Sequence, residues 1–286
     1  MFVLALPLLA AITDAGSLIL SKLFLRRFGR LTFKEFNWLA FLGIVTVLVV
    51  ISILFDQFPT RQMIFSNWPQ LLGLAGLGTF ANVLFFRGLE GESVSNVEPF
   101  IIFKPLAAIL IASLAFPSER SLVIYLTIIA SALILAWAHF SNKKIKLSSE
   151  LLSIMGFWGV YGVELIFVNN LLDVFTPIEL YLIRCAFVFV ALTIVSRPNF
   201  SIMRWNHIPY SIMLGALAVL AVVAIYTSFQ QIGLASSMLV MVISPILVYW
   251  FSAHLLKEKW SNKNIISSVL IVLLVVIASW INAQWN

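Results

Sequence analysis

Charged residues are scarce in this chain. They make up 10% of its 286 residues, whereas soluble domains carry about 25%, and 62% of the residues are hydrophobic. The mean hydropathy is +1.04. A chain this apolar cannot cover its surface with polar groups in water, so a soluble globular protein is excluded. The composition predicts a multi-pass membrane protein, which we expect in the cell (inner) membrane.

Cysteine and histidine are scarce as well. The single cysteine, Cys185, allows no internal disulfide and implies no metal cluster. The three histidines, His139, His207 and His254, share no metal-ligand spacing, and the sequence contains no HExxH motif, P-loop or nucleophile elbow. We therefore expect no metal, no cofactor and no enzymatic activity.

The net charge of +6 is small for a nucleic-acid-binding protein, and the lysines and arginines lie between apolar runs. This pattern predicts loops that face anionic lipid headgroups, with the bilayer and not nucleic acid as the partner. Six tryptophans near the ends of the runs are typical of interfacial anchors: Trp38, Trp68, Trp205, Trp260, Trp280 and Trp285.

Long apolar runs dominate the chain. A membrane-spanning helix needs about 20 apolar residues, and ten runs of this kind are present. The first of them, MFVLALPLLAAITDAG, lacks a positive n-region and predicts a membrane helix and not a signal peptide. The centres of the ten runs lie near Ile12, Ile44, Thr79, Lys104, Ile129, Tyr161, Phe187, Leu217, Leu247 and Leu273.

The chain also contains an internal repeat. Residues 105–137 and 245–280 each contain a mid-helix proline, an apolar half-helix, a glutamate in a short turn, a serine and another apolar span. This pattern predicts an all-α fold of ten transmembrane helices, made of two five-helix repeats at residues 1–145 and 146–286. Because five is odd, the repeats are inverted, an architecture typical of transporters with a midplane substrate site.

Two segments carry a resemblance to a known family. SVSNVEPFIIFKPLAAILIASLAFPSERS and SSMLVMVISPILVYWFSAHLLKEKWS resemble the repeated motif of the EamA family, in the drug/metabolite transporter superfamily. The turn AFPSE, where the family usually has Gly-Glu, and the additional Pro99 depart from that motif. The resemblance implies a ten-helix secondary carrier for small organic metabolites that is not driven by ATP and has no bound cofactor.

The basic residues are distributed unevenly between the loops. Arg61 and Arg120 fall on one side of the predicted membrane, and fourteen fall on the other. The positive-inside rule therefore predicts that the fourteen face the cytoplasm and that both termini lie outside. The resemblance implies the reverse, with both termini inside. The fourteen are Lys22, Arg26, Arg27, Arg30, Lys34, Arg87, Lys143, Lys144, Lys146, Arg197, Arg204, Lys257, Lys259 and Lys263.

Four ionisable side chains fall near the middle of apolar runs: Asp14, Lys104, Glu164 and Arg184. Intramembrane charges tend to face a cavity or one another and to mark transport paths. One interpretation is a polar central cavity that binds substrate. The alternative is two structural ion pairs that hold helices together. Asp14 lies among small residues in the first run and is the candidate for ion or proton coupling.

Phe157, Tyr161 and Glu164 are spaced i, i+4 and i+7 and share one helix face. An aromatic face that ends in a carboxylate suits an ammonium group, although packing against a neighbouring helix explains the aromatics equally well. Mid-span Asn82 and Tyr226 are candidates to hydrogen-bond a substrate, with a packing role as the alternative.

Pro105 and Pro245 each remove a backbone donor in the middle of a predicted span, which predicts a kink and a freed carbonyl one turn back. Lys104 lies directly beside the first of these kinks. Kinks of this kind favour a role in gating.

These patterns predict a secondary transporter that moves a small polar metabolite by alternating access. Charges of both signs favour a zwitterion such as an amino acid over a bare cation or anion. The alternatives are a carrier or flippase of an amphipathic lipid intermediate and, with the least support, an intramembrane enzyme. We expect a small-molecule substrate and the lipid bilayer as partners, and both a monomer and a homodimer stay open.

Overall fold

The structure of the protein is a computed structural model, and it describes residues 4–29, 31–91, 103–117, 120–140, 149–257 and 262–285. Several sequence predictions fall outside these ranges. They concern the boundary between the two repeats at residue 145, the loop residues Lys143, Lys144 and Lys146, Pro99, and the turn glutamates Glu119 and Glu258.

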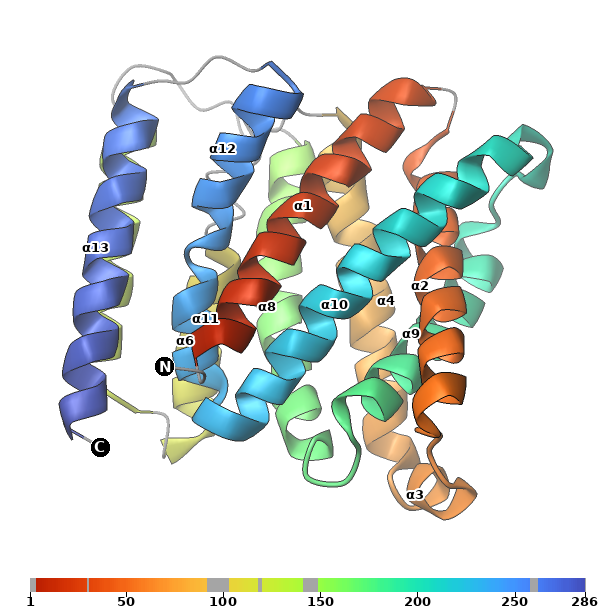
Figure 1. Cartoon of the computed structure of the whole chain (residues 1–286), viewed down its shortest axis with the longest axis horizontal. Helices are drawn as coiled ribbons and strands as arrows, with labels where there is room; N and C mark the ends of the chain where they lie inside the picture. Colours follow the sequence, from red (N-terminus) through yellow and green to blue (C-terminus); the bar gives the residue numbers. More distant parts are fainter. Residues whose placement is uncertain are drawn as a thin grey trace.

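The described residues form helices joined by short connections, and none of them lies in a strand (Figure 1). The α-helices are α1 Ala5–Arg27, α2 Phe33–Phe55, α3 Arg61–Ser66, α4 Trp68–Gly91, α6 Phe103–Ala115, α7 Leu122–Phe140, α8 Ser149–Leu171, α9 Pro177–Ser196, α10 Ile208–Ile232, α11 Leu234–Met241, α12 Ser244–Leu255 and α13 Asn262–Trp285. Two 3₁₀ turns, η3 Phe200–Ile202 and η4 Trp205–His207, connect α9 to α10.

Seven segments of the described chain are long and apolar enough to cross a membrane. They coincide with α1, α2, α4, α8, α9, α10 with the turn before it, and α11 together with α12. Three shorter apolar helices lie at Lys104–Ala115, Leu122–Ile134 and Ile265–Ala278. The predicted all-α membrane fold is therefore confirmed.

Local sequence explains where several helices begin. At the start of α2 the Thr32 backbone N–H donates to Glu35 (3.0 Å), and at the start of α9 the Thr176 N–H donates to Glu179 (2.9 Å). Both are capping boxes, which satisfy backbone donors that a helix start leaves free. Pro177 follows at the first helical position, where its fixed φ is pre-organised for a helix.

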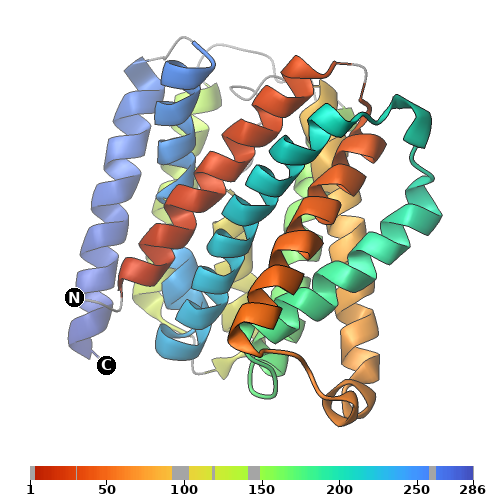
Figure 2. The ribbon, with the colours of Figure 1, turned by 45° about the vertical axis from the view of Figure 1, so that its right-hand side comes forward.

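The helices pack as a bundle in which segments distant in sequence lie side by side. α1 runs along α10, and α10 also packs on α2 (Figures 1 and 2). α4 packs on α8 and α9, α6 on α8 and α11, α1 on α12, α2 on α9, and α7 on α13. Four of these helices, α1, α6, α8 and α9, carry the intramembrane charges Asp14, Lys104, Glu164 and Arg184, respectively.

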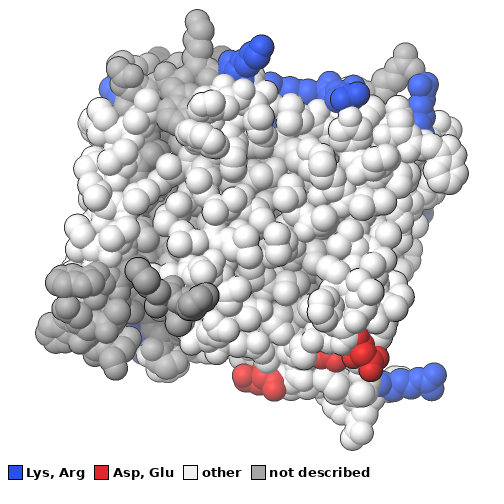
Figure 3. Space-filling model, in the orientation of Figure 1, with Lys and Arg blue, Asp and Glu red and all other residues white. Residues whose placement is uncertain are grey.

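The two ends of the molecule differ in charge (Figure 3). We name the end where α1 ends and α10 begins the basic end, because it carries Arg26, Arg27, Lys34, Arg197 and Arg204. Asp56, Asp173 and Glu179 lie at the opposite, acidic end, where α2 and α8 end and α9 begins. α1 begins and α13 ends at the acidic end (Figure 1). The cytoplasmic position of the basic end stays a prediction.

Two residues differ from their predicted surroundings. Lys22 lies within α1 and is buried, not in a loop, because α1 continues to Arg27. Trp38 is half-buried, and its Nε1 donates a hydrogen bond to Thr193 Oγ1 (2.9 Å), which joins α2 to α9. By contrast, the Trp205 side chain is 91% exposed at the basic end, as expected of an interfacial anchor.

Gly43 of α2 and Gly215 of α10 allow the backbones of these helices to meet. A Cβ on Gly43 would overlap with the backbone of Ser211, and a Cβ on Gly215 would overlap with the backbone of Gly43. The Ser211 hydroxyl donates to the Leu39 carbonyl at the same crossing. Small residues at helix crossings are typical of membrane proteins, where close packing drives association.

We expect Gly43→Ala to lower the free energy of unfolding by about 1–3 kcal/mol, because neither helix backbone can move aside locally. Thermal unfolding of the purified protein in detergent measures the effect. Gly159→Ala in α8 is the matched control, since a Cβ there meets no atom within 4 Å. An equal change in stability for both variants would contradict the close approach of α2 and α10.

Candidate functional site

Asp14 of α1 and Lys104 of α6 form an ion pair. The Lys104 Nζ lies 3.4 Å from Asp14 Oδ1, and the side chains are 18% and 33% exposed, respectively. The second carboxylate oxygen, Asp14 Oδ2, accepts a hydrogen bond from the Ser244 hydroxyl of α12 (2.9 Å). One carboxylate therefore joins three helices and stays partly accessible.

Pro245 explains why Ser244 can reach Asp14. α11 ends at Met241 and α12 begins at Ser244, with Pro245 in the first turn. Proline is tolerated there because the backbone N–H groups of a helix start have no intrahelical partner. The span is therefore broken into two helices, where the sequence predicted a kink. Pro105 lies directly after Lys104 at the start of α6, in the corresponding position.

A small cavity lies at this break. Its volume is about 10 Å³, room for about one water molecule, and it is lined by Asp14, Lys104, Pro105, Met238, Met241, Ser244 and Pro245. Both prolines and both members of the ion pair thus line the same space. A larger ligand enters this cavity only if the surrounding helices separate.

Glu164 of α8 and Arg184 of α9 form the second ion pair, with Arg184 Nε 2.5 Å from Glu164 Oε1. The Glu164 side chain is 1% exposed and that of Arg184 is 11% exposed. Gly78 of α4 faces the pair, and a Cβ there would lie 2.9 Å from Glu164 Oε1. Among the described residues, Glu164 Oε2 has no hydrogen-bond partner. This pair is therefore buried, and within the described residues one carboxylate oxygen of Glu164 accepts no hydrogen bond.

Tyr161 links the two ion pairs. The Lys104 Nζ lies 4.9 Å from the centre of the Tyr161 ring, a cation–π contact. Tyr161 is on the same helix as Glu164, three residues before it. Phe157 packs on Tyr161 with ring centres 5.5 Å apart, and on Phe85 of α4 at 4.9 Å. The predicted aromatic face of α8 therefore contacts the lysine directly.

The remaining predicted residues take part in packing. Asn82 donates to the Gly78 carbonyl one turn back in α4 (2.7 Å). Tyr226 of α10 is buried, and its ring centre lies 6.0 Å from those of Tyr181 and Phe229. Tyr181 in turn lies 6.0 Å from the Arg184 guanidinium. Tyr226 thus lies near the second ion pair, with Tyr181 in contact with both.

Three residues near the ion pairs were not singled out from the sequence: Ser244, Gly78 and Tyr181. Ser244 could have been identified by its place before Pro245, where Lys104 stands before Pro105 in the first repeat. Gly78 and Tyr181 carry no comparable signal, because their roles depend on which helices lie opposite them.

The four intramembrane charges form two ion pairs between helices. Asp14 and Lys104 line a cavity of about 10 Å³, and the partners of each pair lie within 3.4 Å of one another. Each pair neutralises its charges without bulk water, which lowers the cost of burying them. The described residues contain no group of three or more side chains suited to a metal ion.

Comparison with known proteins identifies a shared fold only. No family model matches the chain, and no curated protein matches it. Among 21 matching chains of solved structures, one crystal structure of a protein with no stated function has a TM-score of 0.72. It is 14% identical, and the match covers 97% of this chain and 98% of the other. The two proteins therefore share one fold over nearly the full length of both chains.

Proposed function

We propose that this protein is a secondary transporter that moves a small polar organic metabolite across the membrane by alternating access, as an EamA-type carrier. The observation that carries the proposal is the presence of two ion pairs, Asp14–Lys104 and Glu164–Arg184, within otherwise apolar helices. Intramembrane charges are costly, and they mark solute or ion pathways more often than they support folding alone.

The packing of the helices supports two inverted five-helix halves. In these halves α1 corresponds to α8, α2 to α9, α4 to α10, α6 to α11 and α12, and α7 to α13. Under this exchange, the contact of α4 with α8 becomes that of α10 with α1, and the contact of α6 with α8 becomes that of α12 with α1. The contacts of α2 with α9 and of α7 with α13 map onto themselves. Ten spans related in this way match known transporter architecture.

The partly exposed ion pair of Asp14 and Lys104 is the proposed entry point for substrate. A zwitterion such as an amino acid presents a carboxylate that can replace Asp14 at Lys104 and an ammonium group that can replace Lys104 at Asp14. Tyr161 already contacts one cation through its ring face, and that face suits a substrate ammonium group equally well. The buried Glu164–Arg184 pair keeps α8 and α9 together while the cavity at the broken helices widens.

Counterflow in liposomes tests this proposal. We expect proteoliposomes preloaded with one class of solute (amino acids, amines or nucleosides) to take up the same labelled solute several-fold above protein-free liposomes, because a carrier exchanges substrate without an energy source. Scrambling of a labelled lipid without solute counterflow would instead identify a flippase. Chemical conversion of the solute without vectorial movement would identify an enzyme. Either result would contradict the proposal.

A further inference from the structure

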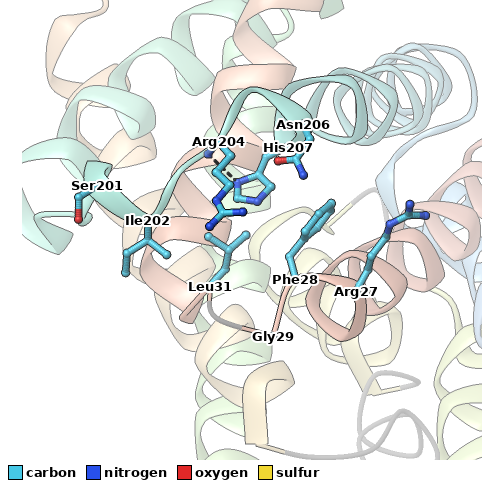
Figure 4. Close-up of a pocket in the computed structure, with 9 residues that line it drawn as sticks. All are labelled: Arg27, Phe28, Gly29, Leu31, Ser201, Ile202, Arg204, Asn206 and His207. Atoms are coloured by element: carbon cyan, nitrogen blue, oxygen red, sulfur yellow. Dashed lines mark hydrogen bonds between the residues drawn. The ribbon is translucent and has the colours of Figure 1, made fainter.

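A second, larger pocket lies at the basic end, far from the ion pairs in the fold. Its volume is about 650 Å³, and Figure 4 shows the residues that line it. One wall comes from the segment that ends α1, with Arg27, Phe28 and Leu31. The other comes from the turns that precede α10, with Arg204, Asn206 and His207. The pocket therefore joins two helices that also pack on each other along their length.

The polar groups of this pocket favour an anion. The guanidinium groups of Arg27 and Arg204 both line it, and no carboxylate is among its lining residues. Among the described residues neither arginine forms an ion pair. Arg27 lies over the Tyr210 ring (5.2 Å) and over the Phe28 ring (6.0 Å). Both arginines are exposed and keep their hydrogen-bond donors for a ligand.

His207 adds a further donor. Its Nδ1 accepts a hydrogen bond from the Arg204 backbone N–H (3.2 Å), so in the neutral ring Nε2 carries the proton and can only donate. The ring is held in place by Phe28, at 4.5 Å between ring centres in an edge contact, and the residue is buried. With the Asn206 amide, the pocket thus offers several donors around a floor that includes the buried Leu31.

The position of the pocket indicates where its ligand comes from. Trp205 stands between two lining residues, and its 91% exposed ring is typical of side chains at headgroup level. Phe200, also in this connection, is 54% exposed. A basic pocket flanked by exposed aromatic rings is typical of the level of phospholipid headgroups. The planar guanidinium group of arginine can donate two parallel hydrogen bonds to the oxygens of a phosphate.

We propose that this pocket binds the phosphate headgroup of an anionic phospholipid from the leaflet at the basic end. The two guanidinium groups and the His207 Nε2–H contact the phosphate oxygens, the Asn206 amide contacts the glycerol part, and the exposed aromatic rings contact the upper acyl chain. A bound lipid then holds the end of α1 against the start of α10. This inference does not depend on the proposed transport function.

A thermal-shift titration of the full-length protein in neutral detergent tests the proposal. The probes are short-chain phosphatidylglycerol, short-chain phosphatidylcholine and inorganic phosphate. We expect phosphatidylglycerol alone to raise the unfolding temperature of the wild type in a saturable way. The double variant Arg27→Gln/Arg204→Gln should bind it roughly tenfold more weakly or worse, since it loses two charge-assisted contacts. Lys34→Gln/Arg87→Gln is the control, because it removes the same charge from exposed positions outside the pocket.

An equal loss of affinity in the control variant would show that only surface charge matters, and it would overturn the proposal. A shift of the same size with inorganic phosphate would assign the pocket to a soluble phosphate and overturn the lipid assignment. Arg204→Lys keeps the charge but not the planar fork, and it should bind phosphatidylglycerol with intermediate affinity. Wild-type affinity in this variant and in the double variant would place the lipid elsewhere.

Discussion

Arg184→Met is expected to destabilise the folded protein by about 3–5 kcal/mol, because it leaves Glu164 as a buried acid with no cationic partner. Glu164 is 1% exposed, and Arg184 Nε is the group that contacts its Oε1 at 2.5 Å. Its second oxygen has no hydrogen-bond partner among the described residues that could compensate. Thermal unfolding and the yield of folded protein in detergent measure the loss.

Two further variants make this prediction specific. Adding Glu164→Gln to Arg184→Met should recover most of the lost stability, since no unpaired charge remains. Lys104→Met is the matched comparison, because it breaks the pair whose acid is 33% exposed. Its cost should be smaller than that of Arg184→Met, because Asp14 is less buried than Glu164 and keeps the hydrogen bond from Ser244. Equal losses for Arg184→Met and Lys104→Met would contradict the difference in burial between the two pairs.

Asp14→Asn is expected to abolish proton-driven accumulation of substrate in liposomes, while counterflow of preloaded substrate continues in part. The amide keeps the shape of the side chain and can still accept the Ser244 hydrogen bond, but it cannot take up and release a proton. Uptake against an imposed pH gradient, compared with counterflow at equal pH, separates the two activities. Accumulation with wild-type pH dependence would mean that Asp14 is not the coupling residue.

Two controls accompany this variant. Ser244→Ala removes the hydrogen bond to Asp14 Oδ2 but leaves the carboxylate, so accumulation should persist with a changed pH dependence. The double variant Lys104→Met/Asp14→Asn contains neither charge of the pair, and its stability should be close to that of the wild type. If Lys104 binds substrate, the apparent affinity in counterflow stays weak in this double variant. Recovery of wild-type affinity would assign Lys104 to the fold alone.

The helical membrane fold could be predicted because its causes are local. In a bilayer every backbone donor and acceptor must be satisfied by the protein, and an apolar run of about 20 residues does so within itself only as a helix, wherever it packs. The break before α12 could be anticipated from Pro245 for a similar reason, since proline lacks the backbone donor that a continuous helix requires. The interruption of the helix at Val242 and Ile243, instead of a simple kink, could not be anticipated, because it depends on what surrounds the turn.

The sequence by itself determined that this protein has an all-α membrane fold and that two acids and two bases lie within its apolar spans. It could not decide which acid meets which base, since Lys104 had both Asp14 and Glu164 as candidate partners. Only the tertiary structure decided that Lys104 pairs with Asp14 and Arg184 with Glu164. The physical reason is that an ion pair between helices depends on how each helix is rotated and where it crosses its neighbours. Those angles are set by contacts such as Gly43 on Gly215, which bring together residues far apart in the chain.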